Sequence, residues 1–174
     1  GNFKAYTWLL SRVAEERRMV LISPSYGMGN WDMRHGPEAV MNALDDTAKH
    51  LKLDLSRVHL AGLSNGGLGV SRTAASRFGN RFRSLLLVSP MFDTEALKSA
   101  SFEHYWHGKP VLVITGEEDD RVPRDYVEDC AALMRNSDTN VEMTTYPGAN
   151  HFLFFSHRDR FLKQFSEWLA RQDG

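Results

Sequence analysis

The sequence predicts an α/β protein, a mostly parallel sheet with helices on both of its faces. Apolar runs of strand length alternate with helical patterns along all 174 residues, as in repeated strand–helix units. Two of these runs, 85–88 and 111–114, contain no polar residue, which is typical of central strands covered on both faces. We therefore expect a single domain over residues 1–174.

The first elements are expected to be a helix through Trp8, Leu9 and Val13 and then a strand from Met19 to Ser23. Pro37 begins the next helix, because proline suits a first helical turn and apolar side chains recur behind it at helical spacing. These recurring residues are Val40, Leu44, Thr47 and Leu51.

Four further strands follow, with helical patterns between them. Their ranges are Val58 to Gly62, Ser84 to Ser89, Val111 to Thr115 and Val141 to Tyr146. The last strand alternates apolar and polar residues, so we expect it at an edge of the sheet with one wetter face. A closing helix carries Phe161, Phe165, Trp168 and Leu169 on one face, which predicts core packing.

The composition excludes several classes of protein. The 21 lysines and arginines nearly balance the 22 aspartates and glutamates, and no basic stripe indicates a nucleic-acid partner. No apolar run is long enough to span a bilayer. The one cysteine, Cys130, lies in a helical pattern, so we expect a buried thiol and no disulfide within the chain.

No signal peptide is visible at the start, which slightly favours the cytoplasm, although a targeting signal would precede Gly1. No group of residues has the spacing of metal ligands, so we expect neither a metal nor another cofactor. The sequence gives no oligomeric state.

A Gly-x-Ser-x-Gly motif follows the strand from Val58 to Gly62, with Ser64 at its centre and Gly62 and Gly66 two residues away on either side. A sharp turn from strand to helix requires almost no side chain at those flanking positions. Such a turn is a nucleophile elbow, which exposes the serine hydroxyl and directs the next backbone N–H, that of Asn65, toward an oxyanion.

An acid and a base follow the elbow, as activation of a serine requires. A carboxylate-rich turn that contains Asp119 comes after the strand from Val111 to Thr115, and a turn that contains His151 comes after the last strand. The order serine, aspartate, histidine, with each residue at the carboxyl end of a strand, is a sharper signal than any one motif.

With these residues the chain resembles an α/β-hydrolase over essentially its whole length. The matching motifs are Gly62-Leu63-Ser64-Asn65-Gly66-Gly67, Gly116-x-x-Asp119-x-x-Val122-Pro123 and Gly148-Ala149-Asn150-His151-Phe152. The resemblance implies Ser64 as nucleophile, His151 as base, Asp119 as orienting acid and Asn65 as oxyanion donor.

Two other aspartates compete for the role of acid. Asp120 is the nearest rival, and Asp93 is an outside candidate because some family members place their acid after the preceding strand. An N-cap is the simpler reading of Asp93. Glu117 and Glu118 are expected to form a solvated acidic rim.

The six other histidines lack the Gly-Ala-Asn context of His151 and are each expected to be surface or core residues. They are His35, His50, His59, His104, His107 and His157. Among these, His104 and His107 are also candidates for the mouth of the site.

The family comparison also implies that three strands before the first helix are missing. One of them would lie between the strands Met19 to Ser23 and Val58 to Gly62, and without it backbone donors and acceptors would be unpaired. We therefore expect the sequence to be the C-terminal part of a longer chain and the segment alone to be insoluble or inactive. The second oxyanion donor would then lie upstream or at Gly1 to Phe3.

The short connection from Met91 to Lys109 cannot build a large cap, so we expect an open site for a small ester or acyl substrate. Several apolar side chains are candidates to line it, although each also suits core or rim packing. The candidates are Tyr26, Met28, Trp31, Met91, Phe92, Tyr105, Trp106 and Phe152.

The elbow is similar to those of feruloyl-type esterases, polyhydroxyalkanoate depolymerases and prolyl-oligopeptidase-like hydrolases. The sequence therefore predicts a cofactor-independent serine hydrolase that cleaves carboxylic esters through an acyl-enzyme. A serine peptidase of the prolyl-oligopeptidase type is the alternative, because the motifs do not separate esters from amides. A non-catalytic binding member of the fold is the third reading.

Overall fold

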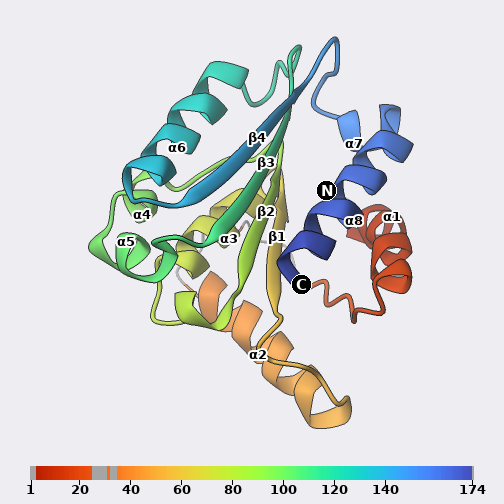
Figure 1. Ribbon diagram of the computed structural model, residues 1–174, viewed down its shortest axis with the longest axis vertical. Helices are drawn as coiled ribbons and strands as arrows, with labels where there is room; N and C mark the ends of the chain where they lie inside the picture. Colours follow the sequence, from red (N-terminus) through yellow and green to blue (C-terminus); the bar gives the residue numbers. More distant parts are fainter. Residues whose placement is uncertain (1–2, 25–30, 32–34, 174) are drawn as a thin grey trace.

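The computed structural model describes residues 3–24, 31 and 35–173. Four strands form one parallel sheet in the order β1-β2-β3-β4: β1 (His59–Leu63), β2 (Ser84–Val88), β3 (Pro110–Gly116) and β4 (Asn140–Tyr146). The order in space is the order in the chain, so every connection returns over a face of the sheet (Figure 1). The predicted α/β class with a parallel sheet is confirmed.

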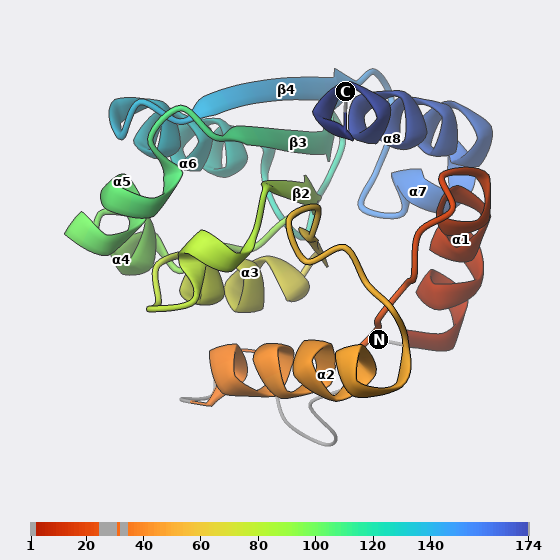
Figure 2. The same cartoon turned by 60° about the horizontal axis from the view of Figure 1, so that its bottom comes forward.

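Helices cover both faces of the sheet (Figures 1 and 2). One layer holds α2 (Gly36–His50), α3 (Gly66–Ala74), α4 (Thr94–Leu97), α5 (Ala100–Trp106) and α6 (Arg124–Asn136), with a 3₁₀ turn η1 (Gly79–Arg81). The other layer holds α1 (Phe3–Glu16), α7 (Leu153–Ser156) and α8 (Arg158–Asp173). Figure 2 shows α2 beyond α3, so α2 is the outermost helix of its layer.

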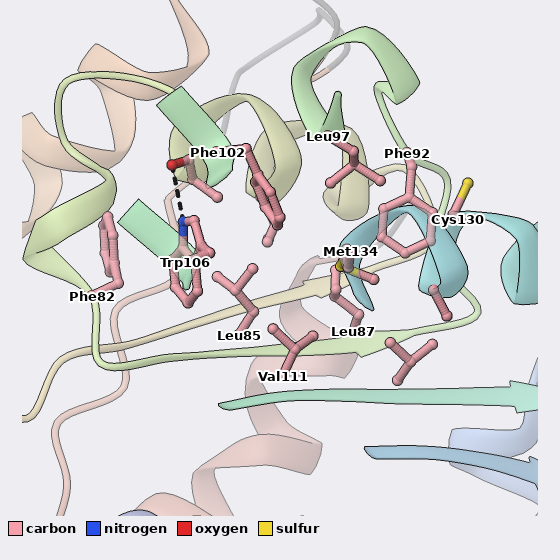
Figure 3. Packing of buried hydrophobic residues seen from close by; sticks show 14 of the residues in the cluster. Phe82, Leu85, Leu87, Phe92, Leu97, Phe102, Trp106, Val111, Cys130 and Met134 are labelled. Atoms are coloured by element: carbon pink, nitrogen blue, oxygen red, sulfur yellow. Dashed lines mark hydrogen bonds between the residues drawn. The ribbon is translucent and has the colours of Figure 1, made fainter. Parts of the chain in front are cut away.

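The alternating side chains of β2 separate two hydrophobic cores. Leu85 and Leu87 face the layer with α3 and α6, while Leu86 and Val88 face the layer with α1 and α8. Because successive strand residues point to opposite faces, a run with no polar residue serves both cores. Figure 3 shows the first core, in which the Trp106 indole N–H donates to the Ala74 carbonyl at 3.0 Å.

The strand predicted at Met19 to Ser23 is wrong, because this segment contains no strand. A strand exists only by pairing with a neighbour, and within the described residues β1 pairs with β2 alone. Ala61 in the middle of β1 is accordingly exposed, whereas all five residues of β2 are buried.

The other predicted elements are present. Pro37 lies in the first turn of α2, and β4 is an edge strand of the described sheet with Glu142 exposed. The aromatic face of α8 is buried, as is Cys130 on α6. One residue differs, since Trp8 on α1 is 55% exposed while Leu9 beside it is fully buried. No helix among the described residues is both long enough and apolar enough to cross a membrane.

Candidate active site

Ser64 occupies a strained turn between β1 and α3. Its φ of +52° lies in the left-handed region, which residues other than glycine seldom adopt. Three backbone bonds hold it there, since its N–H donates to the Val88 carbonyl at 2.9 Å and its carbonyl accepts from the amides of Gly67 and Met91. The partly exposed Ser64 side chain therefore stands at the carboxyl edge of the sheet.

Two glycines make this turn possible, and one of them differs from the prediction. A Cβ on Gly62 would lie 2.7 Å from the backbone of Gly66, and a Cβ on Gly67 would lie 2.2 Å from the Met91 carbonyl oxygen. A Cβ on Gly66 would meet nothing within 4 Å. The tight approach thus depends on Gly62 and Gly67, because the backbone of Gly66 is the contact surface and its own side-chain position is open.

The structure brings Ser64, His151 and Asp119 together. His151 Nε2 lies 2.9 Å from Ser64 Oγ, while His151 Nδ1 lies 2.9 Å and 3.0 Å from the two oxygens of Asp119. The imidazole and the carboxylate are both buried, and only the serine end of the chain of contacts reaches solvent. This is the geometry that a serine nucleophile with a base and an orienting acid requires.

Asp119 is fixed by its own loop as well as by His151. One of its oxygens accepts from the backbone amides of Arg121 at 3.0 Å and Val122 at 2.9 Å. Burial alone would raise the pKa of Asp119, but the Val122 amide, His151 and the Arg121 amide together hold that pKa below its usual value. Asp120 is exposed, and only Asp119 of the two contacts the imidazole.

The loops that carry the acid and the base are fastened to each other. A Cβ on Gly116 would lie 2.2 Å from the Ala149 carbonyl oxygen, so a glycine is needed where β3 ends. The Glu118 amide donates to Ala149, and the Glu117 carboxylate accepts from the Gly148 amide at 2.9 Å. Glu117 and Glu118 are exposed as expected, and Glu117 additionally anchors the histidine loop.

Asp93 is not part of this group. Its carboxylate caps α4 by accepting from the Ala96 amide at 3.1 Å, and it pairs with Arg72 at 2.6 Å. The simpler reading as an N-cap is confirmed.

Asn65 directly follows Ser64 and precedes the first residue of α3. No hydrogen bond to another described residue uses its backbone N–H, so this donor is free to bind an oxyanion at the positive end of the helix. The second donor expected at Gly1 to Phe3 falls mainly outside the described residues, which begin with Phe3 in α1.

The predicted lining residues divide by exposure. Met91 is 40% exposed beside the elbow. Phe152 is 39% exposed, and its ring lies edge-on to the His151 ring with 5.6 Å between the two ring centres. Trp31 packs against Gly69 in the middle of α3. Tyr26 and Met28 lie outside the described residues.

Phe92 and Trp106 were expected to line the site, and the structure contradicts both expectations. Trp106 is fully buried in the core that Figure 3 shows, and Phe92 is buried against Tyr126. The indole N–H of Trp106 is already bonded within the fold. An apolar side chain in a short connection can turn inward, and these two do so because the connection itself packs on the core.

Arg121 was missed by the sequence reasoning. Its guanidinium carbon lies 4.7 Å from the centre of the Phe152 ring, a cation–π contact that places a positive charge near His151. The sequence signal was its position inside the Asp119 turn, but a single charged residue in a loop resembles any solvated side chain.

Comparisons with known proteins agree with this architecture. The model of the prolyl oligopeptidase family matches residues 98–173. Arabidopsis thaliana SOBER1 superposes with a TM-score of 0.62 at 22% identity, over 80% of this chain and 65% of that chain. A search of curated proteins found no match.

A carboxylesterase from Bacillus cereus gives a TM-score of 0.61 at 22% identity, over 78% of this chain and 59% of that one. An acylaminoacyl peptidase from Pyrococcus horikoshii gives a TM-score of 0.64 at 15% identity, over 78% of this chain and 27% of that chain. The chain has the α/β-hydrolase fold.

In this fold Ser64, Asp119 and His151 lie on loops that leave the carboxyl ends of β1, β3 and β4, respectively. The chain spans 65% of the length of SOBER1. The α/β-hydrolase fold therefore accounts for the position of the site, while activity and substrate require an argument from the site itself.

Proposed function

We propose that this protein is a serine hydrolase that cleaves carboxylic esters through an acyl-enzyme. Ser64 Oγ attacks the acyl carbon while His151 Nε2 takes its proton, and the Asn65 N–H stabilises the oxyanion that forms. Asp119 holds the imidazole in the required tautomer and stabilises the imidazolium. The alcohol leaves with the proton from His151.

Water completes the reaction by the reverse proton route. His151 takes a proton from the water as its oxygen attacks the acyl carbon, and the tetrahedral intermediate collapses to release the carboxylic acid. Ser64 recovers its proton from His151. Each proton and bond in these steps is balanced by Ser64, His151, the substrate and water.

One observation carries the proposal: Ser64 has a φ of +52°, and its Oγ lies 2.9 Å from His151 Nε2. Ser64 combines this strained backbone with a partly exposed hydroxyl and a histidine that a buried carboxylate holds, which is the combination a nucleophile requires. The structural similarity to a carboxylesterase supports an ester as the first substrate to test.

Hydrolysis of p-nitrophenyl esters of increasing acyl length by the intact protein tests this proposal, with a peptide p-nitroanilide measured alongside. We expect ester turnover, and we expect Ser64→Ala to lower kcat/KM by at least about 10³-fold. Ester turnover that persists in the Ser64→Ala variant would contradict the proposal.

A serine peptidase of the prolyl-oligopeptidase type is the second candidate. The family model that matches residues 98–173 and the similarity to an acylaminoacyl peptidase favour it. The same experiment separates the two, because a peptidase also releases p-nitroaniline from the anilide in a reaction that Ser64→Ala abolishes, whereas an esterase leaves the anilide intact. A folded protein that cleaves neither substrate would point to a non-catalytic binding function.

A further inference from the structure

A concave site lies at the opposite end of the sheet from Ser64. A cavity of about 480 Å³ is formed by the segments that lead into β1, β2 and β3 together with the last turn of α8. Because the strands are parallel, these segments meet at the amino ends of the strands, whereas Ser64 follows the carboxyl end of β1. The volume is within the range of small-molecule sites.

The lining of this cavity is strongly basic. Arg81, Arg83, Lys109 and Arg171 all contribute to it, and no aspartate or glutamate is among the described residues that line it. Four cations on the walls of one concave surface attract anions, because the low-dielectric walls concentrate the field.

Two of the four cations are paired with carboxylates outside the cavity. Arg171 lies 2.7 Å from Glu142, and Arg81 lies 3.5 Å from the exposed Asp45. Arg83 and Lys109, the other two cations, take part in neither of these ion pairs.

Lys109 has no carboxylate partner among the described residues. Its ammonium donates to the carbonyls of Phe82 at 3.0 Å and Gly79 at 3.4 Å, and it lies 4.8 Å from the centre of the Trp106 ring. Burial lowers the pKa of Lys109, so the cation is held at a cost that a bound anion would offset.

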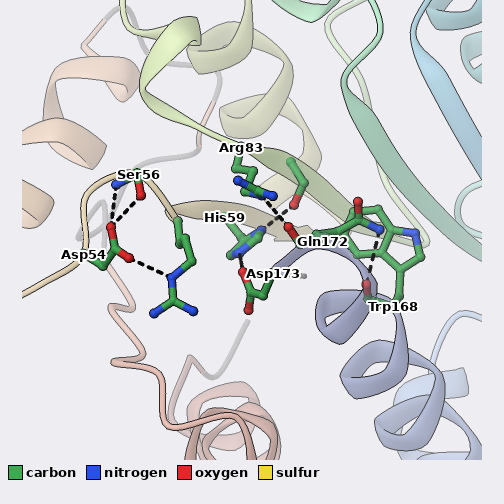
Figure 4. A network of polar contacts seen from close by, with 9 residues as sticks. Asp54, Ser56, His59, Arg83, Trp168, Gln172 and Asp173 are labelled. Carbon is green, nitrogen blue, oxygen red and sulfur yellow. Dashed lines mark hydrogen bonds and ion pairs between the residues drawn. The ribbon is translucent and has the colours of Figure 1, made fainter.

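Arg83 is held in a way that leaves most of its guanidinium free. Figure 4 shows its contact with Gln172, in which Nε donates to the Gln172 carbonyl oxygen. No hydrogen bond to another described residue uses its two terminal nitrogens, and the nearby Asp173 is engaged by His59 at 3.2 Å. The terminal nitrogens of Arg83 thus have no acceptor in the part of the chain that the structure describes.

We propose that this cavity binds a small molecule that carries phosphoryl groups. The free terminal N–H groups of Arg83 match the several oxygens of a phosphoryl group, and Lys109 supplies a point charge beside them. The site is separate from Ser64 and does not depend on the proposed function.

Binding of pyrophosphate to the intact protein, measured by isothermal titration calorimetry, tests this proposal. We expect saturable binding that Arg83→Gln weakens by about tenfold or more. Arg83→Lys should weaken it less, because the charge remains. Ser64→Ala should leave it unchanged, so failure of this proposal and failure of the hydrolase proposal are distinguishable.

Arg124→Gln is the matched control, because Arg124 is an exposed arginine on α6 that pairs with Glu128 at 2.7 Å and does not line the cavity. Binding should change less than about twofold in this variant. Circular dichroism establishes that each variant is folded at the assay temperature. An equal loss in Arg124→Gln, an undiminished affinity in Arg83→Gln, or no saturable binding up to about 10 mM would overturn the proposal.

Discussion

The described residues include two sets of serine, histidine and aspartate in mutual contact, one at each end of the sheet. The set at the carboxyl end is Ser64, His151 and Asp119, and the set at the amino end is Ser84, His59 and Asp173. The serine–histidine distances are 2.9 Å in the first set and 2.6 Å in the second. Distances alone therefore do not distinguish a candidate active site from a structural contact.

Backbone conformation and access distinguish them. Ser64 stands on a turn with φ +52° and is partly exposed, whereas Ser84 is the first residue of β2 and is fully buried. The buried Ser84 hydroxyl is not accessible to a substrate, and no α-helix of the described part of the chain begins directly after Ser84 as α3 begins after Ser64. The second set fastens β1 to β2 and to the end of α8 (Figure 4).

The largest expected effect is the difference in kcat between variants of Asp119 and Asp173, the aspartates of the two sets. Asp119→Asn should lower kcat of the ester hydrolysis by roughly 10³- to 10⁴-fold, because the amide no longer holds the correct tautomer of His151. Asp173→Asn, the matched change in the other set, should alter kcat by less than about twofold, because it lies at the far end of the sheet. Steady-state kinetics of both variants check this prediction.

Asp120→Asn serves as the control within the same loop, since its side chain is exposed. Equal losses in the Asp119 and Asp120 variants would leave the role of Asp119 without support. A loss in Asp173→Asn as large as that in Asp119→Asn would contradict the distinction between the two sets.

The glycines of the elbow provide the next test. Gly67→Ala should lower the free energy of unfolding by about 2 kcal/mol or more, because the new Cβ would overlap the Met91 carbonyl. Gly66→Ala should change stability by less than about 1 kcal/mol, because its position is open and alanine favours a helix. Denaturant unfolding measures both values, and equal effects would refute the steric account of the turn.

A smaller effect concerns the pH dependence of stability at the amino end. Burial lowers the pKa of His59 below its usual 6.5, with smaller contributions from Arg83 and Arg57, and Asp173 opposes the shift. The unfolded chain then binds more protons than the folded one, so stability is fully present above about 6.5 and falls as the pH decreases below it.

His59→Gln should accordingly show less loss of stability between neutral and mildly acidic pH than the wild type. Chemical denaturation at the two pH values measures this difference. His107→Gln is a suitable control, because His107 is a largely exposed histidine. If the His59 and His107 variants both keep the wild-type pH dependence, the buried imidazole is not its source.

Local pattern was enough to predict much of the fold. The strands β2 and β3 were predicted correctly, because a strand that is buried on both faces is apolar at nearly every residue and the sequence shows this directly. The strand at Met19 to Ser23 failed, since a strand also needs a neighbour, which local sequence does not supply. The prediction that Trp106 lines the site was wrong for a similar reason, because the direction of a side chain in a short connection depends on the packing around it.

The site and the amino-end set differ in how visible they are in the sequence. Ser64 and His151 each sit in a turn whose flanking glycines mark its geometry, and the structure brings both to Asp119. His59 and Asp173 carry no such mark, and 114 positions separate them in the chain. Sequence patterns reveal residues whose local backbone is specialised, and the fold alone reveals the others.

Labelling with an active-site-directed fluorophosphonate tests most directly whether Ser64 is the nucleophile. We expect one modified peptide, which contains Ser64, when the labelled protein is digested and analysed by mass spectrometry. Ser64→Ala should abolish the label, and Ser84→Ala should retain it. A label that survives Ser64→Ala, or one found on Ser84, would show that Ser64 is not the nucleophile.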